Sequence, residues 1–390
     1  MNLAEFLASR ALEYTPFDPT HFPRIYARFL ERFSDNTPKI QIVGTNGKGS
    51  TGRFITLLLE QAGLKVLHFT SPHLLSFNER FYTQGSIVSD NALQEAHAHL
   101  HRLRLDFKIS YFEYATLLAV VLAKDCDLMV LEAGLGGELD STTHLRHRCA
   151  LVCTPISLDH TDRLGNTLAE IAHTKLTAMG NLPPHTPVVL APQEASVAFQ
   201  AQEIAKSHAL ALHQVKAPSA IARAYADLHD YPFFLAQNFQ VALDTLDALQ
   251  IPYNPATTPA LNLHGRFEKL ASNVIVDVVH NVGGAQVLKE ALQKRFGRQK
   301  IHLIYNSYAR KDAQGILKCL KPILARVWIL EVDDMQMMEL GALERLLGKL
   351  NVAWEFFTWK KFYALQADCL WVVGGSFRVV EVFLRGYYAK

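Results

Sequence analysis

The chain has 390 residues, of which 49% are hydrophobic and 19% are charged. This length predicts two or three domains, and the ordinary balance of apolar and charged residues excludes a disordered chain. The net charge of +2, from 39 Lys and Arg against 37 Asp and Glu, lacks the electrostatic footprint of a nucleic-acid-binding protein. We therefore expect a globular protein with no nucleic-acid partner.

Membrane proteins and disulfide-rich secreted proteins are also excluded at this stage. The longest apolar run, residues 115–123 with Thr116 inside it, is far shorter than the roughly 20 residues that cross a bilayer. The N-terminal sequence MNLAEFLASR has no signal-peptide pattern. The five cysteines form no CxxC pair, which indicates reduced thiols rather than a disulfide framework or a zinc site. We expect a cytoplasmic protein without a membrane anchor.

Strands and helices alternate along the first two thirds of the chain. The sequence predicts strands over residues 39–43, 66–69, 127–132, 150–155 and 188–190. It predicts helices over residues 54–63, 112–124 and 234–249. This alternation is typical of a mostly parallel sheet covered by helices on both faces. In such sheets ligands bind at the carboxyl ends of the strands, where the polar, glycine-rich segments of this chain fall.

The Pro-, Thr- and Asn-rich segment IPYNPATTPALN marks a predicted domain boundary. Beyond it, strands are predicted over residues 274–279, 301–305, 327–332 and 370–373, again alternating with helical patterns. We therefore expect two α/β domains, residues 1–260 and a smaller domain of residues 261–390.

A glycine-rich loop, GTNGKGST from Gly44 to Thr51, follows the first strand and opens a helix. In this context backbone N–H groups and the helix dipole bind phosphates. The spacing differs from the strict Walker pattern GxxxxGK[ST], because only two residues separate Gly44 from Gly47. Lys48 would place its charge on the transferred phosphate, and Ser50 or Thr51 would help to hold magnesium. The alternative is a tight strand-to-helix turn without a ligand.

Three further polar positions follow strands or lie near them. Glu132 ends its strand beside the phosphate loop, where a carboxylate is a natural magnesium ligand. Asp159 and His160 follow the next strand, and Lys175 lies in the helix that Thr167 is expected to cap. Taken singly, His160 and Lys175 fit structural or surface roles better than ligand roles. Only the whole set points to a site.

A series of motifs makes this set specific. GTNGKGS, TSPHL with FNERF, YFEYAT, LEAGLGGELDST, DHTDRLGNT, HGRFE and DVVHN occur in this order, and GGSFRVVEVF follows near the C-terminus. From about residue 39 onward the chain resembles the folylpolyglutamate synthase and dihydrofolate synthase family, which is related to the Mur ligases. The resemblance implies an α/β fold in which a phosphate-loop ATPase domain precedes a smaller Rossmann-like domain of the glutamate-ligase C-terminal type.

The resemblance also implies an activity, that of an ATP-dependent acid–amino-acid ligase in folate biosynthesis. Such a ligase adds L-glutamate to dihydropteroate, as a dihydrofolate synthase, or to a reduced folate, as a folylpolyglutamate synthase. We expect both activities, with ATP activating the acceptor carboxylate as an acyl phosphate. The expected partners are dihydropteroate or folate, L-glutamate and ATP, and the expected state is a monomer.

Residue roles of the family carry over to the matching positions. The ATP contacts would be Asn46, Gly47, Lys48, Gly49, Ser50, Thr51, Asn238, Arg266 and Asp277, with His280 as a further candidate. Two magnesium ions would take ligands from Ser50, Ser71, Glu132, His160 and a carbamylated Lys175. The pterin would lie against Phe112, Glu113, Tyr114, Leu139, Asp140 and Ser141. The catalytic set would be Lys48, Glu132, His160, Lys175 and Arg266.

The chain departs from the family pattern beside the expected pterin loop. Where the family commonly reads GGRLDATN, this chain has Glu138, Ser141 and Thr143 at the Arg, Ala and Asn positions, so one charge is reversed. Lys175 is followed by LTA in place of the usual AGI. The segment YTPFDPTHFPRIYARF, residues 14–29, is a candidate contributor to the pterin site.

Two alternative functions stay open. One is a Mur-type amino-acid ligase that acts on another carboxylate. Such enzymes carry a substrate domain ahead of the phosphate loop, whereas 43 residues precede Gly44 here. The other is a non-catalytic nucleotide-binding regulatory protein that uses the loop as a switch. The metal-ligand set and the pterin motifs count against the second alternative.

Overall fold

The computed structural model describes residues 2–10, 18–103 and 109–389. The chain forms two compact units. The large unit consists of Met1–Ile156, Leu164–Tyr225 and Gln237–Leu261, and the small unit consists of Ser157–Arg163, Ala226–Ala236 and Asn262–Lys390. The division after Leu261 lies beside the boundary expected at residue 260. The two short segments that group with the small unit were not predicted.

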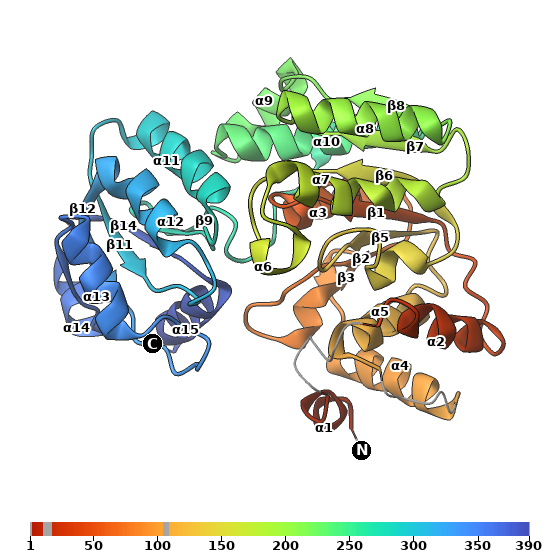
Figure 1. Cartoon of the computed structure of the whole chain (residues 1–390), viewed down its shortest axis with the longest axis horizontal. Coiled ribbons are helices and arrows are strands. Elements are labelled where there is room, and N and C mark those ends of the chain that lie inside the picture. Colours follow the sequence, from red (N-terminus) through yellow and green to blue (C-terminus); the bar gives the residue numbers. More distant parts are fainter. Residues whose placement is uncertain (1, 11–17, 104–108, 390) are drawn as a thin grey trace. The chain divides into compact units, whose positions relative to one another are not determined.

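The large unit is built on a sheet of eight strands within the described residues, in the order β4-β3-β2-β5-β1-β6-β7-β8 (Figure 1). The strands are β1 (Lys39–Val43), β2 (Val66–Phe69), β3 (Phe81–Thr83), β4 (Ser86–Ile87), β5 (Leu128–Glu132), β6 (Arg148–Cys153), β7 (Pro187–Leu190) and β8 (Ala211–Gln214). Only β3 and β4 are antiparallel to their neighbours in this part of the chain. The mostly parallel sheet is confirmed, and its antiparallel edge is an addition to the prediction.

Ten described helices lie before, between and after these strands along the chain, and parts of α6, α9 and α10 group with the small unit. They are α1 (Leu3–Ala8), α2 (His21–Leu30), α3 (Lys48–Gln61), α4 (Asp90–Arg102), α5 (Tyr111–Leu122), α6 (Thr161–Leu164), α7 (Leu168–Leu176), α8 (Ala195–Ser207), α9 (Ala220–Leu228) and α10 (Phe233–Ala248). Helix α3 begins at Lys48, ahead of the apolar stretch that predicted it, because the second half of the glycine-rich loop is already helical. Thr167 caps α7 as predicted, accepting a hydrogen bond from the N–H of Glu170.

One polar residue divides the core on one face of this sheet. Gln41 of β1 lies in register with Leu131 of β5 and Leu151 of β6, and parallel neighbours in register point to the same face. Leu131 belongs to an apolar core with α1, α2, α4 and α5, whereas Leu151 belongs to another core with α7 and α8. Gln41 is fully buried between them, and its side-chain oxygen accepts a hydrogen bond from Arg148 at 2.8 Å. Helix α3 packs on the opposite face, where Gly52 lies against Ile42.

The small unit has its own sheet, in the order β13-β12-β11-β14-β10-β9. Its strands are β9 (Glu268–Ala271), β10 (Val274–Val276), β11 (Ile301–Tyr305), β12 (Leu324–Ile329), β13 (Trp354–Phe356) and β14 (Leu370–Gly374). Its helices are α11 (Val282–Phe296), α12 (Ala313–Leu320), α13 (Leu340–Lys349), α14 (Trp359–Leu365) and α15 (Phe377–Tyr388). Among the described strands of this second sheet only β9 is antiparallel, so the predicted second α/β domain is confirmed.

Two predicted strands of this unit end earlier than expected. β10 stops at Val276 rather than at residue 279, because the Asp277 carboxylate accepts a hydrogen bond from the N–H of Val279 and so turns the chain. Val279 has a φ of +34°, outside the range of an extended strand. Likewise β12 ends at Ile329, not at residue 332. Both corrections concern strand ends at the edge of the sheet where loops begin.

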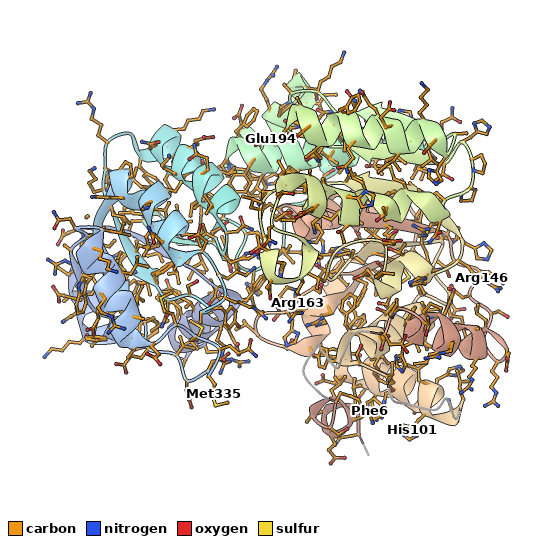
Figure 2. The ribbon with its side chains drawn as sticks, in the orientation of Figure 1. Phe6, His101, Arg146, Arg163, Glu194 and Met335 are labelled. Carbon is orange, nitrogen blue, oxygen red and sulfur yellow. The ribbon has the colours of Figure 1, made fainter. Side chains whose placement is uncertain are left out.

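Helix α1 is attached to α4 by aromatic contacts. The Phe6 ring lies edge-on to the ring of His101, with centroids 6.0 Å apart (Figure 2). Nδ1 of His97, one turn earlier on α4, lies 2.6 Å from the hydroxyl of Tyr114. These histidines thus serve packing between helices. Throughout the described residues, no helix combines the length and the apolar character needed to span a membrane.

Candidate active site

The phosphate loop lies between β1 and α3, at the carboxyl end of the central strand. The N–H groups of Thr45 and Asn46 both donate to the carbonyl of Pro155, at 3.0 and 3.1 Å, which fixes the start of the loop. Gly47 has a φ of +85°, and a Cβ there would lie 2.9 Å from Oδ1 of Asn238. Glycine is therefore required at position 47, and the structure brings the predicted nucleotide contact Asn238 against the loop.

The first turn of α3 offers unpaired backbone donors. Its N-cap is Gly47, which forms no side-chain cap, and the first intrahelical hydrogen bond runs from the N–H of Thr51 to the carbonyl of Gly47 at 2.9 Å. The N–H groups of the residues between them therefore have no partner within the helix. Such an N-terminus carries partial positive charge and is a ready anion site.

Lys48 and Glu132 lie together beside this helix end. Nζ of Lys48 is 3.7 Å from Oε1 of Glu132 and 3.3 Å from the carbonyl oxygen of Thr45. Glu132 is 3% exposed, and its Oε2 accepts hydrogen bonds from the Ser71 N–H at 3.1 Å and from the Thr70 hydroxyl. One predicted catalytic pair and one predicted metal ligand, Ser71, are thus neighbours.

These groups fit magnesium and a nucleotide phosphate. Within the described segments, no three His, Cys, Asp or Glu side chains cluster as a complete metal site. Magnesium, however, usually takes one or two carboxylates and completes its shell with substrate phosphates and water. Glu132 and the buried hydroxyl of Ser50 supply such oxygen donors. The Thr51 hydroxyl is buried as well and lacks a hydrogen-bond partner. The donor set therefore matches a metal that arrives with phosphate.

The loop after Glu132 is held from two directions. A Cβ at Gly137 would clash with the backbone of Lys175, so this glycine lets α7 approach the loop. Lys175 itself is buried. The Asp140 carboxylate accepts hydrogen bonds from the N–H groups of Gly134 and Leu135 at 2.9 and 3.0 Å. Burial raises the pKa of Asp140, and these hydrogen bonds only partly oppose that effect.

Two of the departures from the family pattern lie inside the protein. The Ser141 hydroxyl is 2.7 Å from that of Thr116, and Thr143 accepts a hydrogen bond from Gln41 at 2.5 Å. Ser141 and Thr143 are both buried. Glu138, the position of the reversed charge, is exposed. The loop therefore differs from the family pattern at its surface in one charge only.

The predicted pterin residues differ in how far they reach the surface. Phe112 is partly exposed, and its ring lies against Gly134, where a Cβ would come within 2.7 Å. Leu139 is 43% exposed. Tyr114 has no exposed surface and packs in the core with its hydroxyl on His97, which is a structural position. Burial raises the pKa of the Tyr114 hydroxyl well above its usual range. Phe112 and Leu139 therefore remain the open apolar surfaces of this set.

Asp159 is the centre of a polar cluster in the small unit. Its Oδ2 is 3.1 Å from Nε2 of His280 and 3.2 Å from the Asn281 amide nitrogen, and its Oδ1 pairs with Lys311. Oδ1 also accepts a hydrogen bond from the N–H of His160 at 2.8 Å. Burial alone would raise the pKa of Asp159, but the hydrogen bond from His280 and the surrounding positive charges hold it well below its usual range.

Sheet topology explains why this cluster forms. His280 and Asn281 follow β10, and Lys311 follows β11, both parallel to β14 between them, so these loops leave the same edge of the sheet. Asn281 also caps α11 by accepting a hydrogen bond from the N–H of Gly284 at 2.7 Å. Burial lowers the pKa of the Lys311 ammonium, and the charge of Asp159 opposes that effect.

Arg266 and Asp277 lie near the start of the small unit. The Arg266 guanidinium stands 5.1 Å from the ring centre of Phe377 and donates to the carbonyl of Gly265 at 3.1 Å. The Asp277 carboxylate accepts hydrogen bonds from the N–H groups of Phe267 and Val279, both at 3.0 Å. Burial raises the pKa of Asp277, although the charge of Arg266 opposes this. Asp277 therefore shapes the backbone around Arg266.

The predicted site residues thus divide between the units. The large unit brings together the phosphate loop, Asn238, Ser71 and Glu132, with Lys175 behind the following loop. His160, Arg266, Asp277 and His280 belong to the small unit. Thr70 and Lys311 were not predicted from the sequence. Thr70 directly follows β2 and Lys311 lies in the loop after β11, and their position after strands at ligand-binding edges was the available signal. Tyr14 to Phe17 of the N-terminal candidate segment lie outside the described residues.

Known proteins resemble this chain in sequence and in fold. In a scan against protein-family models, no model matches the chain. A dihydrofolate synthase/folylpolyglutamate synthase of Haemophilus influenzae is 33% identical over 331 residues, which cover 73% of this chain and 72% of that protein. The crystal structure of Helicobacter pylori folylpolyglutamate synthetase is 41% identical, with a TM-score of 0.79, over 100% of this chain and 98% of that one. A bifunctional folylpolyglutamate synthase/dihydrofolate synthase solved with Mn, AMPPNP and L-glutamate shares the fold, at 24% identity and a TM-score of 0.82 over the same shares.

Proposed function

Because the chain belongs to the dihydrofolate synthase/folylpolyglutamate synthase family, we propose that it joins L-glutamate to dihydropteroate and to reduced folates at the expense of ATP. The observation that carries the proposal is the pair of Lys48 and Glu132 beside the open N-terminus of α3. A cation, a metal-binding carboxylate and free backbone donors are the groups that phosphoryl transfer from ATP requires.

The reaction needs two steps, because an unactivated carboxylate has no good leaving group when an amine attacks its carbon. An oxygen of the acceptor carboxylate attacks the γ-phosphorus of ATP, ADP leaves, and an acyl phosphate forms. The amine nitrogen of glutamate then attacks the acyl carbon, phosphate leaves, and the nitrogen loses a proton. Lys48 and the N–H groups of α3 stabilise the charge on the phosphoryl oxygens of the first step.

Magnesium offsets the charge of the phosphates when it is bound. We propose Glu132, Ser50 and Ser71 as ligands of one ion, and Glu132, His160 and Lys175 as ligands of a second. Lys175 can serve only as a carbamate, because its ammonium form has no lone pair to offer and would repel the metal. Support comes from its burial behind Gly137, in the loop that follows Glu132.

The carbamate has a direct test. Lys175→Ala should lose most ligase activity, and a short carboxylate such as acetate or propionate should restore part of it by supplying the missing oxygens. Lys48→Ala is the matched control, because no carboxylate can replace its positive charge. Equal behaviour of the two variants in the presence of acetate would contradict carbamylation.

For the nucleotide, we propose contacts from Asn238 in the large unit and from Arg266, Asp277 and His280 in the small unit. Asn238 is supported by its position against Gly47. Arg266 would bring a positive charge to the phosphates, and Asp277 holds the N–H of Phe267, the residue that follows Arg266. The arginine suits this role because its guanidinium stays charged and binds phosphate through two parallel donors.

For the acceptor, we propose that the pterin lies against Phe112, Glu113 and Leu139. Phe112 and Leu139 offer partly exposed apolar surface, and Glu113 offers a carboxylate. Tyr114, Asp140 and Ser141 support this surface from behind, by packing and by hydrogen bonds to the loop. We further propose that the protein acts as a monomer in the cytoplasm.

The proposal is tested by incubating the purified protein with magnesium, ATP and glutamate, plus either dihydropteroate or tetrahydrofolate. Mass spectrometry of the products should show one added glutamate on each acceptor. Product from dihydropteroate alone would restrict the function to dihydrofolate synthesis. ATP binding without product from either acceptor would overturn the proposal and favour a different carboxylate.

A further inference from the structure

One side chain, Gln193, ties the loop that follows β7 to the segment that follows β6. Its Nε2 donates a hydrogen bond to the carbonyl of Thr154 at 3.0 Å, and its Oε1 accepts one from the N–H of Ile156 at 2.9 Å. These two contacts fix the orientation of the amide, because the flipped group would set donor against donor and acceptor against acceptor. Gln193 therefore holds the backbone on both sides of Pro155.

Sheet topology places Gln193 beside this segment. Strands β1, β6 and β7 are parallel neighbours in the large unit, so the loops that follow them leave the same edge of the sheet. Leu190 at the end of β7 lies in register with Cys153 at the end of β6, and the N–H of Ala191 donates to the carbonyl of Cys153 at 2.9 Å. Gln193 follows two residues later, within reach of the backbone beyond β6.

The peptide group between Pro155 and Ile156 is bonded at both of its ends. Its N–H donates to Gln193, and its C=O accepts from the N–H groups of Thr45 and Asn46 at 3.0 and 3.1 Å. A peptide group is planar, so a partner that holds the N–H also sets the direction of the C=O. Hydrogen bonds linked in this way polarise one another and strengthen together. The Gln193 amide thus orients the carbonyl to which the start of the phosphate loop is bonded.

The same segment contacts the phosphate loop at a second point. The Thr154 hydroxyl donates to the carbonyl of Val43 at 3.2 Å, and a Cβ at Gly44 would lie 2.0 Å from that hydroxyl oxygen. Groups packed this closely transmit a displacement, because they cannot shift independently without a clash. A movement of residues 154–156 would therefore move residues 43–46, and with them the open N-terminus of α3.

We propose that Gln193 is a positioning residue for nucleotide binding, which sets the phosphate loop through the peptide group of Pro155 and Ile156. The inference rests on the proposed function and deepens it, because it concerns the same loop. It assigns the Gln193 amide to the binding of ATP, and not to the binding of the acceptor or of glutamate.

The experiment replaces Gln193 by methionine, which has nearly the same length and volume but no amide. Gln193→Met should raise the KM for ATP about tenfold, as expected when one hydrogen bond that orients a binding loop is lost. The KM for dihydropteroate and the KM for glutamate should stay close to those of the wild type. Gln94→Met is the matched control, because Gln94 also bonds a backbone group, the N–H of Leu3 at 3.0 Å, but lies on α4. This control should change none of the three KM values.

A second variant decides if Gln193→Met does not fold. Gln193→Glu keeps an oxygen for the N–H of Ile156 and loses only the donor to the Thr154 carbonyl. It conserves the shape of the side chain, and it too should raise the KM for ATP alone. An equal rise in all three KM values would mean a general loss of structure and would overturn the inference.

Nucleotide binding can also be measured without turnover. Calorimetric titration with AMPPNP and magnesium should give a dissociation constant about tenfold higher for Gln193→Met than for the wild type. An unchanged dissociation constant would overturn the inference. A wild type that binds AMPPNP but joins glutamate to neither acceptor would overturn the proposed function, and the titration would still decide the role of Gln193.

Discussion

Two buried aspartates, Asp140 in the large unit and Asp159 in the small unit, are held in opposite ways. Asp140 is surrounded by neutral donors, the N–H groups of Gly134, Leu135 and Thr142 together with the Thr142 hydroxyl. Asp159 is surrounded by Lys311, His280 and Asn281. The pKa of Asp140 is raised by burial, whereas the pKa of Asp159 is held low against the same burial effect.

The difference shows what each carboxylate does for the molecule. Hydrogen bonds from neutral donors offset only part of the free-energy cost of burying a charge. The role of Asp140 is therefore to fix the backbone of the loop that follows Glu132. A cationic donor offsets more of this burial cost, so Asp159 stays ionised. Its contacts hold the segment of residues 157–163 to the rest of the small unit. Glu132 stands apart from both, because it faces a lysine at 3.7 Å beside free helix N–H groups.

The largest expected effect is the loss of ligase activity when Glu132 is replaced. Glu132→Ala should lower ligase activity by about a thousandfold or more, because it removes both the metal-binding oxygens and the partner of Lys48. The melting temperature should change little, since the Thr70 and Ser71 donors can turn to water at the site. Glu95→Ala, an exposed carboxylate on α4, is the control and should leave both unchanged. Turnover near that of the wild type would remove Glu132 from the metal site.

The next largest effect is on the stability of the small unit, when the lysine that pairs with Asp159 is replaced. Lys311→Met should destabilise the small unit by about 3–5 kcal/mol, because it leaves a buried carboxylate without its main cation. All four tryptophans lie in this unit, so their fluorescence during urea unfolding reports on it selectively. Adding Asp159→Asn should restore part of the loss.

The matched control for Lys311 is an exposed lysine of the same unit. Lys361 pairs with Glu355 at 2.8 Å, but the two side chains are 46% and 36% exposed. Solvent screens such a pair, so Lys361→Met should cost less than about 1 kcal/mol. Equal losses for the two lysine variants would mean that the Asp159 cluster contributes no more than a surface pair.

The contrast between these sites also shows what the sequence could predict. The phosphate loop and Glu132 could be placed, because glycine spacing and strand patterns are local properties and parallel strands end at a common edge. The partnership of Asp159 with Lys311 could not, because 152 residues separate them and no local pattern links them. The burial of Tyr114 could not be predicted from the sequence for a related reason. Its motif predicts a helix facing the substrate, but only the packing of α1 and α4 decides which side of that helix is closed.

The smallest expected effect is a pair of opposite pH dependences. The folded-state pKa of Asp140 is raised, so its contribution to stability is full below about pH 4 and is lost as the pH rises through that folded pKa. The advantage of the wild type over Asp140→Asn should therefore be largest in acid and shrink toward neutral pH. Circular dichroism of urea unfolding at about pH 4 and pH 7 would measure it.

Asp230 of the small unit supplies the opposite sign. A hydrogen bond from Arg295 lowers the pKa of Asp230 to about 2, so its contribution is present above about pH 4 and is lost as the pH falls toward that value. Because Asp230 is largely exposed, Asp230→Asn should cost less than about 1 kcal/mol near neutral pH and nothing in strong acid, as followed by tryptophan fluorescence. If both variants had the same pH slope, the surroundings of these carboxylates would not set their charge, and the contrast between Asp140 and Asp159 would lose its electrostatic basis.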